Sequence, residues 1–315
     1  MVCINEKIST IENIGRALKE VDYICDTHIA TTLYLAFNLN KPVLIEGPAG
    51  VGKTELAKKT ASFLDLPLVR LQCYEGLDES KSLYEWKYGK QLLYTQILKD
   101  KLNDIVKEKN SLAESIEALH RYDDIFFSKQ FLEPRPLLNA LQYDAGAILL
   151  VDEIDKSDDE FEAFLLEILS DFQVSIPEIG TIKATSTPLV FLTSNNTREL
   201  SDALKRRCLH LYIHFPESRL EREIISVRVP GISEHLKVQL VDFIQEVRKL
   251  DVKKIPSISE TIDWAKVLLL LHAENLDTEL VRKTLNVFLK FESDIALVND
   301  HLQELTHHAV KEASG

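Results

Sequence analysis

The sequence predicts a three-layer α/β domain built on a parallel five-stranded sheet, followed by a small all-α domain. Three observations lead to this fold class. Apolar runs alternate with helical patterns as far as residue 216, a glycine-rich loop follows the first of these runs, and residues 217–315 contain helical patterns but no convincing strand. Alternating strands and helices are typical of a parallel sheet covered on both faces. We therefore expect an α/β core over residues 1–216 and a helical domain over residues 217–315.

The individual elements follow from hydrophobic periodicity. Short apolar runs predict five buried strands, at residues 42–46, 68–73, 147–151, 189–193 and 210–213. Helical patterns accompany them at residues 8–38, 53–65, 158–171 and about 199–206. Two further features interrupt the alternation: an insert of helix and loop over residues 76–145, and alternating residues that predict a β-hairpin over residues 173–184.

Composition excludes several classes of protein. The chain has 315 residues, 45% hydrophobic and 28% charged, which is typical of a globular protein and not of a disordered or collagenous one. Its 37 basic and 50 acidic residues give a net charge of −13, which argues against a protein that mainly coats nucleic acid. The widely spaced cysteines, Cys3, Cys25, Cys73 and Cys208, favour reduced thiols. The sequence has no signal-peptide pattern, and no apolar run approaches the length of about 20 residues that spans a bilayer. We therefore expect a cytoplasmic protein with no membrane contact.

The strongest motif lies between the first predicted strand and the helix after it. It fits the pattern G-x-x-x-x-G-K-[ST] and consists of Gly47, Pro48, Ala49, Gly50, Val51, Gly52, Lys53 and Thr54, with Glu55 following. Glycines let successive N–H groups turn toward phosphate oxygens, and the helix that begins near Lys53 adds its positive end. Lys53 is expected to reach the β- and γ-phosphates and Thr54 to bind Mg²⁺. The alternative is a purely structural glycine-rich turn.

A second motif is the acidic end of the strand at residues 147–151. Asp152 and Glu153 follow it directly, so one carboxylate can hold Mg²⁺, directly or through water, while the other polarises the water that attacks the γ-phosphate. Acidic capping of the next helix is the alternative for this pair. The acidic residues that continue from Asp155 to Asp171 are expected to form mostly a solvated helix face.

With these motifs the chain resembles the AAA+ ATPases, which are P-loop NTPases, and more narrowly their MoxR branch and its CoxD-like group. The segments that carry the resemblance are residues 46–55, 70–78, 150–155, 161–167, 172–181, 193–200 and 202–208. They lie within residues 20–270, the part of the chain that the resemblance covers. It implies ATP and Mg²⁺ as ligands and hydrolysis of ATP to ADP and phosphate.

The resemblance also implies roles for residues outside the two motifs. Asn195, with Asn196 as the alternative, matches sensor 1 and would orient the lytic water. Arg207, with Arg206 as its rival, matches an arginine finger that acts on ATP held by the next subunit. Tyr23 and Ile24 fall where relatives contact the adenine, although they fit a packed core equally well.

Two departures from the family pattern stand out. Residues 256–261 carry no basic residue where relatives have the sensor 2 arginine, and Arg206 stands where many relatives have an aspartate before the finger. The first departure leaves two alternatives open: the sensor 2 function is missing, or another part of the protein supplies it.

The function implied is that of a ring-forming remodelling ATPase, in a hexamer, because a finger acting in trans requires a neighbour. A chaperone-like role in inserting metal cofactors is implied, with a von Willebrand A (VWA) domain partner and a metalloenzyme client of the molybdenum-hydroxylase type. The hairpin 173–184 and the insert 76–145 are the expected contact surfaces. Two alternatives stay open: a nucleic-acid motor or loader, and a nucleotide-dependent binding module with little turnover.

Two weaker features have simpler interpretations. His210 and His214 share one face of a predicted strand, but a metal site would need a third ligand, so packing or surface placement is favoured. Tyr84 and Trp86 could contact a client, but packing in a core is the default interpretation for aromatic side chains.

Overall fold

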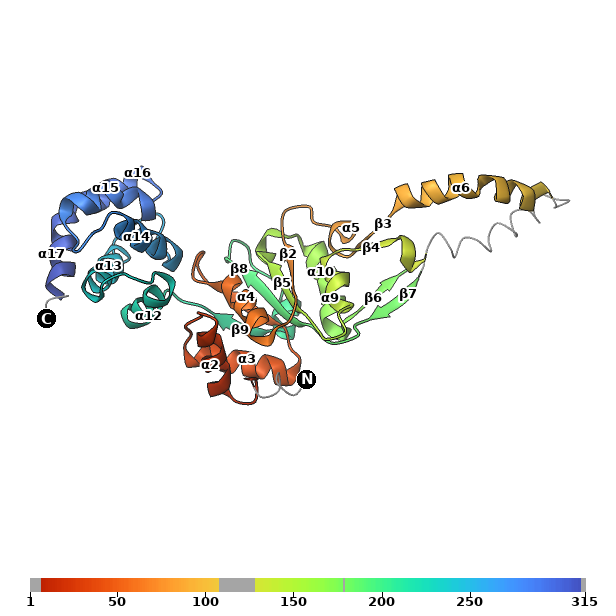
Figure 1. Cartoon of the computed structure of the whole chain (residues 1–315), viewed down its shortest axis with the longest axis horizontal. Helices are drawn as coiled ribbons and strands as arrows, with labels where there is room; N and C mark the ends of the chain where they lie inside the picture. The colour runs from red at the N-terminus through yellow and green to blue at the C-terminus, as the bar shows by residue number, and fades with distance from the viewer. Residues whose placement is uncertain (1–6, 108–127, 178, 313–315) are drawn as a thin grey trace.

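The computed structural model describes residues 7–107, 128–177 and 179–312, and the elements in this part of the chain alternate as predicted (Figure 1). Before the last sheet strand the elements are α2 (Ile11–Glu20), α3 (Thr27–Leu39), β1 (Val43–Glu46), α4 (Lys53–Leu64), β2 (Leu68–Gln72), α5 (Glu79–Ser82), β3 (Tyr84–Trp86), α6 (Tyr88–Lys107), η1 (Lys129–Phe131), β4 (Leu132–Pro134), α9 (Pro136–Leu141), β5 (Ile148–Asp152), η2 (Ile154–Lys156), α10 (Asp159–Asp171), β6 (Gln173–Ile176), β7 (Gly180–Lys183), β8 (Leu189–Ser194) and α11 (Asp202–Arg207). Then follow β9 (Leu209–Tyr212), α12 (Ser218–Arg228), α13 (Glu234–Val247), α14 (Ile258–Leu270), α15 (Thr278–Phe288), α16 (Glu292–Asp300) and α17 (Leu302–Glu312).

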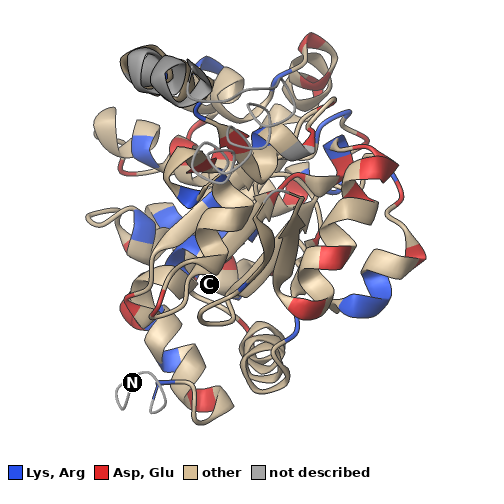
Figure 2. Cartoon of the chain, turned by 90° about the vertical axis from the view of Figure 1, so that its right-hand side faces the viewer, with Lys and Arg blue, Asp and Glu red and all other residues tan. Residues whose placement is uncertain are grey.

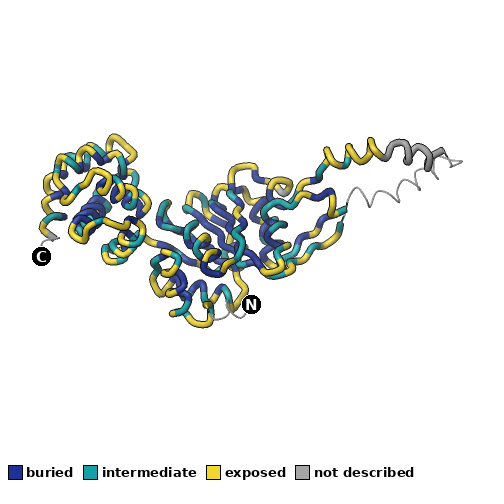
Figure 3. Tube along the Cα trace, viewed as in Figure 1, coloured by how far each residue is buried: buried dark blue, intermediate teal, exposed yellow. Residues whose placement is uncertain are grey.

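The main sheet is parallel and five-stranded, with the order β2-β5-β8-β1-β9, as the sequence predicts. The inner strand β5, between β2 and β8, is buried along its whole length, because helices cover both faces. Leu149 and Val151 belong to one apolar core with α9, α10 and α11, whereas Ile148 and Leu150 belong to the other with α2, α3 and α4. Alternate residues of one strand thus reach two cores, which gives the three layers of Figure 1 and the buried centre of Figure 3.

A separate apolar core holds the helices α12 to α17 together. Its centre is an aromatic cluster in which Trp264 packs against Phe288 at 4.6 Å and Phe243 at 5.3 Å between ring centroids. Figure 1 shows these helices at one end of the molecule, with α6 at the opposite end. Among the described helices, none is both long enough and apolar enough to cross a bilayer.

The predicted helix over residues 8–38 is wrong as a single element, because the chain breaks between α2 and α3. Asp22 has a left-handed backbone with φ +63°, which a continuous helix does not allow. Asp26 then begins α3 by accepting a 2.8 Å hydrogen bond from the Ile29 N–H. The predicted helix near 199–206 likewise begins later, at Asp202, with Ser201 as its cap.

The insert contains more than the predicted helix and loop. Strands β3 and β4 pair antiparallel, and Trp86 on β3 is buried with its ring edge-on to Tyr84, so both aromatics belong to packing. α6 confirms the expected helix, and Leu92 and Ile97 on it are 61% and 68% exposed. Residues 108–127 of the insert and residue 178 of the hairpin lie outside the described residues, but β6 and β7 pair antiparallel as predicted.

Basic and acidic residues are both spread over the outer helices and loops, while the sheet strands carry few (Figure 2). This distribution agrees with the apolar sequences of the central strands β5 and β8.

Candidate nucleotide site

The loop between β1 and α4 approaches other backbone so closely that it needs glycine. Gly47 has φ +143°, and a Cβ there would lie 2.2 Å from the carbonyl oxygen of Ile213. Gly50 has φ +77°, and a Cβ there would lie 2.2 Å from the hydroxyl of Ser257 in the helical domain. The loop leads into α4, whose first N–H groups have no partner within the helix and form an anion-binding end.

Lys53 lies at the centre of the site. Its amine donates to the carbonyls of Gly47 and Pro48, both at 2.7 Å, and to Asn195 Oδ1 at 2.8 Å. Burial lowers the pKa of Lys53, and the nearby carboxylates, Asp155 first among them, partly oppose this shift. The amine is therefore held among acceptors that a phosphate oxygen can replace.

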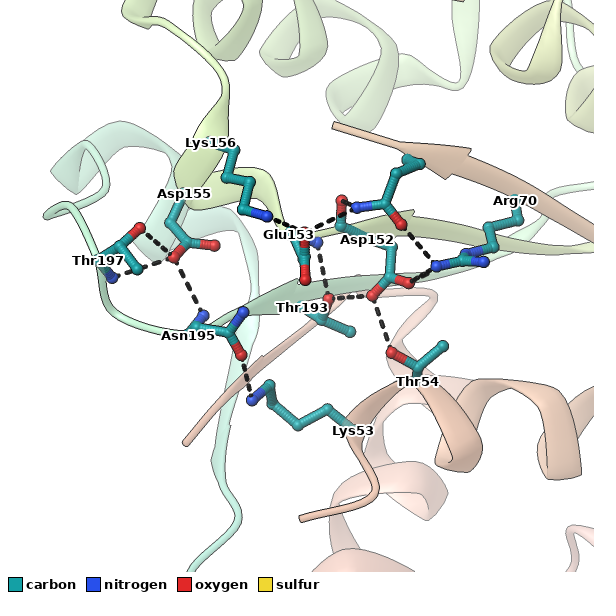
Figure 4. A network of polar contacts seen from close by, with 11 residues as sticks. Lys53, Thr54, Arg70, Asp152, Glu153, Asp155, Lys156, Thr193, Asn195 and Thr197 are labelled. Carbon is teal, nitrogen blue, oxygen red and sulfur yellow. Dashed lines mark hydrogen bonds and ion pairs between the residues drawn. The ribbon is translucent and has the colours of Figure 1, made fainter. Parts of the chain in front are cut away.

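Asp152 and Thr54 place two oxygen atoms that can act as metal ligands side by side (Figure 4). The Thr54 hydroxyl donates to Asp152 Oδ1 at 2.9 Å, and the Thr193 hydroxyl from β8 donates to the same oxygen at 2.5 Å. Mg²⁺ prefers oxygen ligands and is held in nucleotide sites by one or two protein groups together with phosphates, so Thr54 and Asp152 fit it. In the part of the chain that is described, no cluster of three or more His, Cys, Asp or Glu could hold a metal by itself.

Glu153 has an unusual backbone. It takes a left-handed conformation with φ +58°, and its N–H donates to the Thr193 hydroxyl at 2.9 Å. Its carboxylate accepts from Gln72 Nε2 at 2.9 Å and pairs with Lys156 at 2.6 Å. A non-glycine residue in this conformation carries strain that is often stored at functional sites.

The structure separates Asn195 from Asn196. Asn195 points toward Lys53, whereas the Asn196 side chain accepts from the Ser194 hydroxyl at 3.4 Å. Buried Asp155 holds the segment that follows β8. Its Oδ2 accepts hydrogen bonds from the Asn195 N–H at 3.2 Å and from the Thr197 N–H at 3.0 Å. Burial alone would raise the pKa of Asp155, but the hydrogen bonds from Thr197 and Asn195 lower it below its usual value.

Two cavities are lined by residues assigned to the site. One of about 270 Å³ is lined by the glycine-rich loop, Lys53, Asp152 and Glu153. A second cleft of about 660 Å³ is lined by Tyr23, Ile24 and other side chains from β9, α12 and α14. Tyr23 is buried, which raises its pKa, and its ring lies 3.8 Å from where a Gly52 Cβ would be. The second cleft is of a size for a nucleoside beside the loop.

Arg206 and Arg207 are exposed at the end of α11, and neither lines the cavity that contains Lys53. The Arg207 side chain donates to the Ser170 hydroxyl at 2.8 Å. This placement leaves both arginines exposed on the surface.

The expectation that the acidic residues from Asp155 to Asp171 form mostly a solvated face is confirmed, with two buried exceptions. Asp155 is buried on the loop described above, and Glu162 is only 1% exposed. Glu162 pairs with Arg198 at 2.5 Å and accepts from the Ser201 N–H at 3.0 Å, because the segment after β8 covers this face of α10.

Several residues of the site were not expected from the sequence. Arg70 and Gln72 on β2 contact Asp152 and Glu153, and their alternate spacing at the end of an apolar strand was the available signal. From the helical domain, Ser259 donates to the Gly50 carbonyl at 3.1 Å and Arg228 pairs with Glu55 at 3.0 Å. Nothing in the local sequence marks these long-range contacts.

His210 on β9 and His214 just after it do not form a metal site with described residues. His210 Nε2 lies 2.7 Å from Glu46 Oε2, and the His214 ring packs on Tyr212 at 4.5 Å. The favoured interpretation, packing and surface placement, is confirmed.

The chain is similar in sequence to known proteins at low identity. The chain is 26% identical over 238 residues to the gas vesicle ATPase GvpN of Haloferax mediterranei, covering 72% of this chain and 62% of that protein, so it spans less than two thirds of that relative. It is 25% identical over 221 residues to an uncharacterized protein of Staphylococcus epidermidis, covering 68% of this chain and 71% of that one.

Among solved structures, the RuvB Holliday junction branch migration motor of Thermotoga maritima is 19% identical, with a TM-score of 0.42, covering 82% of this chain and 66% of that one. Its P216G mutant gives a TM-score of 0.46 at 19% identity, covering 85% of this chain and 72% of that one. The family described as AAA domain (dynein-related subfamily) matches residues 42–208, which is more than half of the chain and includes the loop, both acidic residues and Asn195. The chain belongs to the dynein-related subfamily of AAA domains.

Proposed function

We propose that the chain hydrolyses ATP with Mg²⁺ at the loop that begins α4. The observation that carries this proposal is that Lys53, Thr54, Asp152 and Asn195, which come from α4, β5 and the end of β8, line one cavity, where Lys53 is hydrogen-bonded to Asn195 and Thr54 to Asp152. The carboxyl ends of parallel strands meet at one sheet edge, which is where open α/β folds bind ligands. Glu153 follows Asp152 at this edge and lines the same cavity.

Each side chain has a defined role in this proposal. The loop N–H groups and Lys53 bind the phosphates, and Tyr23 and Ile24 contact the base in the neighbouring cleft. Thr54 and Asp152 hold Mg²⁺, which when bound neutralises charge on the phosphate oxygens. Glu153 takes the proton of the attacking water, and Asn195 orients that water.

The domain organisation follows from the same contacts. We assign residues 1–216 to the ATPase core and residues 217–315 to an α-helical lid. The Ser259–Gly50 and Arg228–Glu55 contacts support the lid, since both join the helical domain to the loop and α4. Exposed Arg207, or Arg206, is assigned as the finger of a neighbouring subunit, which requires a homo-oligomeric ring, in our proposal a hexamer.

The cellular role we propose is that of a cytoplasmic MoxR-type, CoxD-like chaperone that remodels a metalloenzyme client or inserts its cofactor, together with a VWA-domain partner. The sequence segments quoted above and the similarity to a protein named as a gas vesicle ATPase support an energy-using remodelling role. The hairpin β6–β7 and the insert around α6 are the assigned contact surfaces.

The first experiment measures phosphate release from ATP by the purified protein with Mg²⁺, with and without added DNA. Mg²⁺-dependent release that DNA leaves unchanged is expected. Stimulation by DNA would favour a nucleic-acid motor, against which the net charge of −13 argues. Tight ATP binding without release would favour a nucleotide-dependent binding module, an alternative that the lack of a basic residue over residues 256–261 leaves open.

The client is addressed by affinity capture with a Glu153→Gln form, which should keep ATP and client bound. Recovery of a metalloenzyme supports the chaperone role, whereas capture of nucleic acid alone contradicts it.

A further inference from the structure

The carboxylates around the phosphate cavity are each paired with a cation that lies behind them. Glu153 pairs with Lys156 and Glu55 with Arg228, while Asp152 pairs with Arg70. None of these three basic residues lines the cavity of about 270 Å³ into which the carboxylates face. Arg70 and Lys156 therefore act on a ligand in this cavity through the acidic residues, whereas Arg228 also lines a smaller neighbouring cavity with Gly50 and Gly52.

The pair of Arg70 and Asp152 has the most direct geometry. Arg70 on β2 donates to Asp152 Oδ2 through Nε at 3.0 Å and through Nη2 at 2.6 Å. The Asp152 side chain is 4% exposed, whereas that of Arg70 is 46% exposed. Arg70 also donates to Gln72 Oε1 at 2.5 Å, and Gln72 in turn donates to Glu153. One guanidinium thus reaches both acidic residues that follow the apolar run of β5.

The two oxygens of Asp152 have different partners. Oδ1 accepts from the hydroxyls of Thr54 and Thr193, on the side where Mg²⁺ would be held, and Oδ2 accepts from Arg70. The Arg70 contact therefore leaves Oδ1 turned toward Thr54. It also supplies a positive charge to a buried carboxylate, as Mg²⁺ would.

We propose that Arg70 is a positioning residue that stands in for Mg²⁺ as the counter-charge of Asp152, so that the site accepts the triphosphate before the metal. Without a counter-charge, Asp152 would repel the phosphates, because the interaction of two like charges is strong in a site of low dielectric. With Mg²⁺ present, the metal meets this need and Arg70 becomes less important for affinity. The inference rests on the proposed function of the same site.

The test compares the affinity for a fluorescent ATP analogue in EDTA with the affinity in saturating Mg²⁺. Arg70→Met is expected to weaken binding in EDTA about tenfold, because Asp152 then repels the phosphates without a counter-charge, and to weaken binding in Mg²⁺ by less than about threefold. Arg70→Lys keeps the charge and should retain most of the EDTA affinity. Arg135→Met is the matched control, since Arg135 is 43% exposed and pairs with Glu85 on the insert. It should change neither affinity.

The double variant Arg70→Met with Asp152→Asn removes both charges and separates a charge effect from a folding defect. Its EDTA affinity should return to within about threefold of the wild type, because the repelling carboxylate is gone. Equal losses in EDTA and Mg²⁺, no loss in EDTA, or a double variant as weak as Arg70→Met would each overturn the proposal. Failure of the wild type to bind in either buffer would instead refute the proposed function.

Discussion

The amine of Lys53 donates a 2.8 Å hydrogen bond to Oδ1 of Asn195, although 142 positions separate the two residues. Lys53 opens α4 and Asn195 follows β8, which pairs with β1 in the sheet. The contact joins the group assigned to phosphate binding to the group assigned to the attacking water. A substitution of Lys53 should therefore affect mainly nucleotide binding, and a substitution of Asn195 should affect mainly turnover.

Lys53→Ala should weaken ATP binding about a hundredfold, because it removes a buried cation whose hydrogen bonds to charged groups contribute about 1.5–3 kcal/mol. Calorimetric titration with ATP and Mg²⁺ measures this. Lys59→Ala is the control, since Lys59 lies on the same helix but does not line the cavity. Wild-type affinity in Lys53→Ala would refute the assignment of the loop as a phosphate cradle.

Asn195→Ala should lower kcat about a hundredfold and change KM by less than about threefold, because a group that orients the reacting water acts mainly in the transition state. Asn196→Ala should leave both within about twofold, since its side chain is turned toward Ser194. Steady-state phosphate release measures both variants. The opposite ranking would move the sensor role to Asn196.

Arg207→Ala should abolish turnover while ATP binding persists, because a finger acts on the neighbour's γ-phosphate. Mixing it with inactive Lys53→Ala should restore activity, since some interfaces then combine an intact cavity with an intact finger. The same mixing with Arg206→Ala decides between the two arginines. If neither mixture regains turnover, a finger acting between subunits is excluded for this pair.

Local sequence patterns were enough for the sheet and the loop but not for the contacts between strands. The spacing from Gly47 to Thr54 is short-range and identifies the loop, and the apolar run before Asp152 identifies β5. The partners of Asp152 depend on strand order, because β2 and β8 flank β5 and bring Arg70 and Thr193 to it. Strand order depends on contacts between distant parts of the chain, so the hydrophobic periodicity of single segments does not predict it.

The burial of single charged side chains could not be predicted from the sequence either. Glu162 occupies a polar position of α10 by helical periodicity, yet the segment with Arg198 and Ser201 covers it. The three-residue strands β3 and β4 are too short to give an alternating signal. The break between α2 and α3 was missed because apolar residues continue through it.

Asp155→Asn should destabilise the fold at pH 7 by about 1–3 kcal/mol, since a buried, charged acceptor is lost. The pKa of Asp155 is lowered in the folded state, so its stabilisation is present above the unfolded pKa and disappears as the pH falls through the folded value. The difference in denaturation midpoint from the wild type should therefore shrink as the pH falls below the pKa of an unfolded aspartate, about 3.9. Asp159→Asn, at a side chain 93% exposed, is the control. A difference that grows on acidification would contradict this account of Asp155.

The most direct test of the central claim is a paired measurement of ATP binding and phosphate release in Glu153→Gln. The substitution keeps the size and the Gln72 contact but removes the base, so binding should stay within about threefold while release falls at least a hundredfold, about the effect of a general base. Glu167→Gln, at an exposed position of α10, should behave as the wild type. Release from Glu153→Gln at the wild-type rate would contradict hydrolysis by water activated at Glu153.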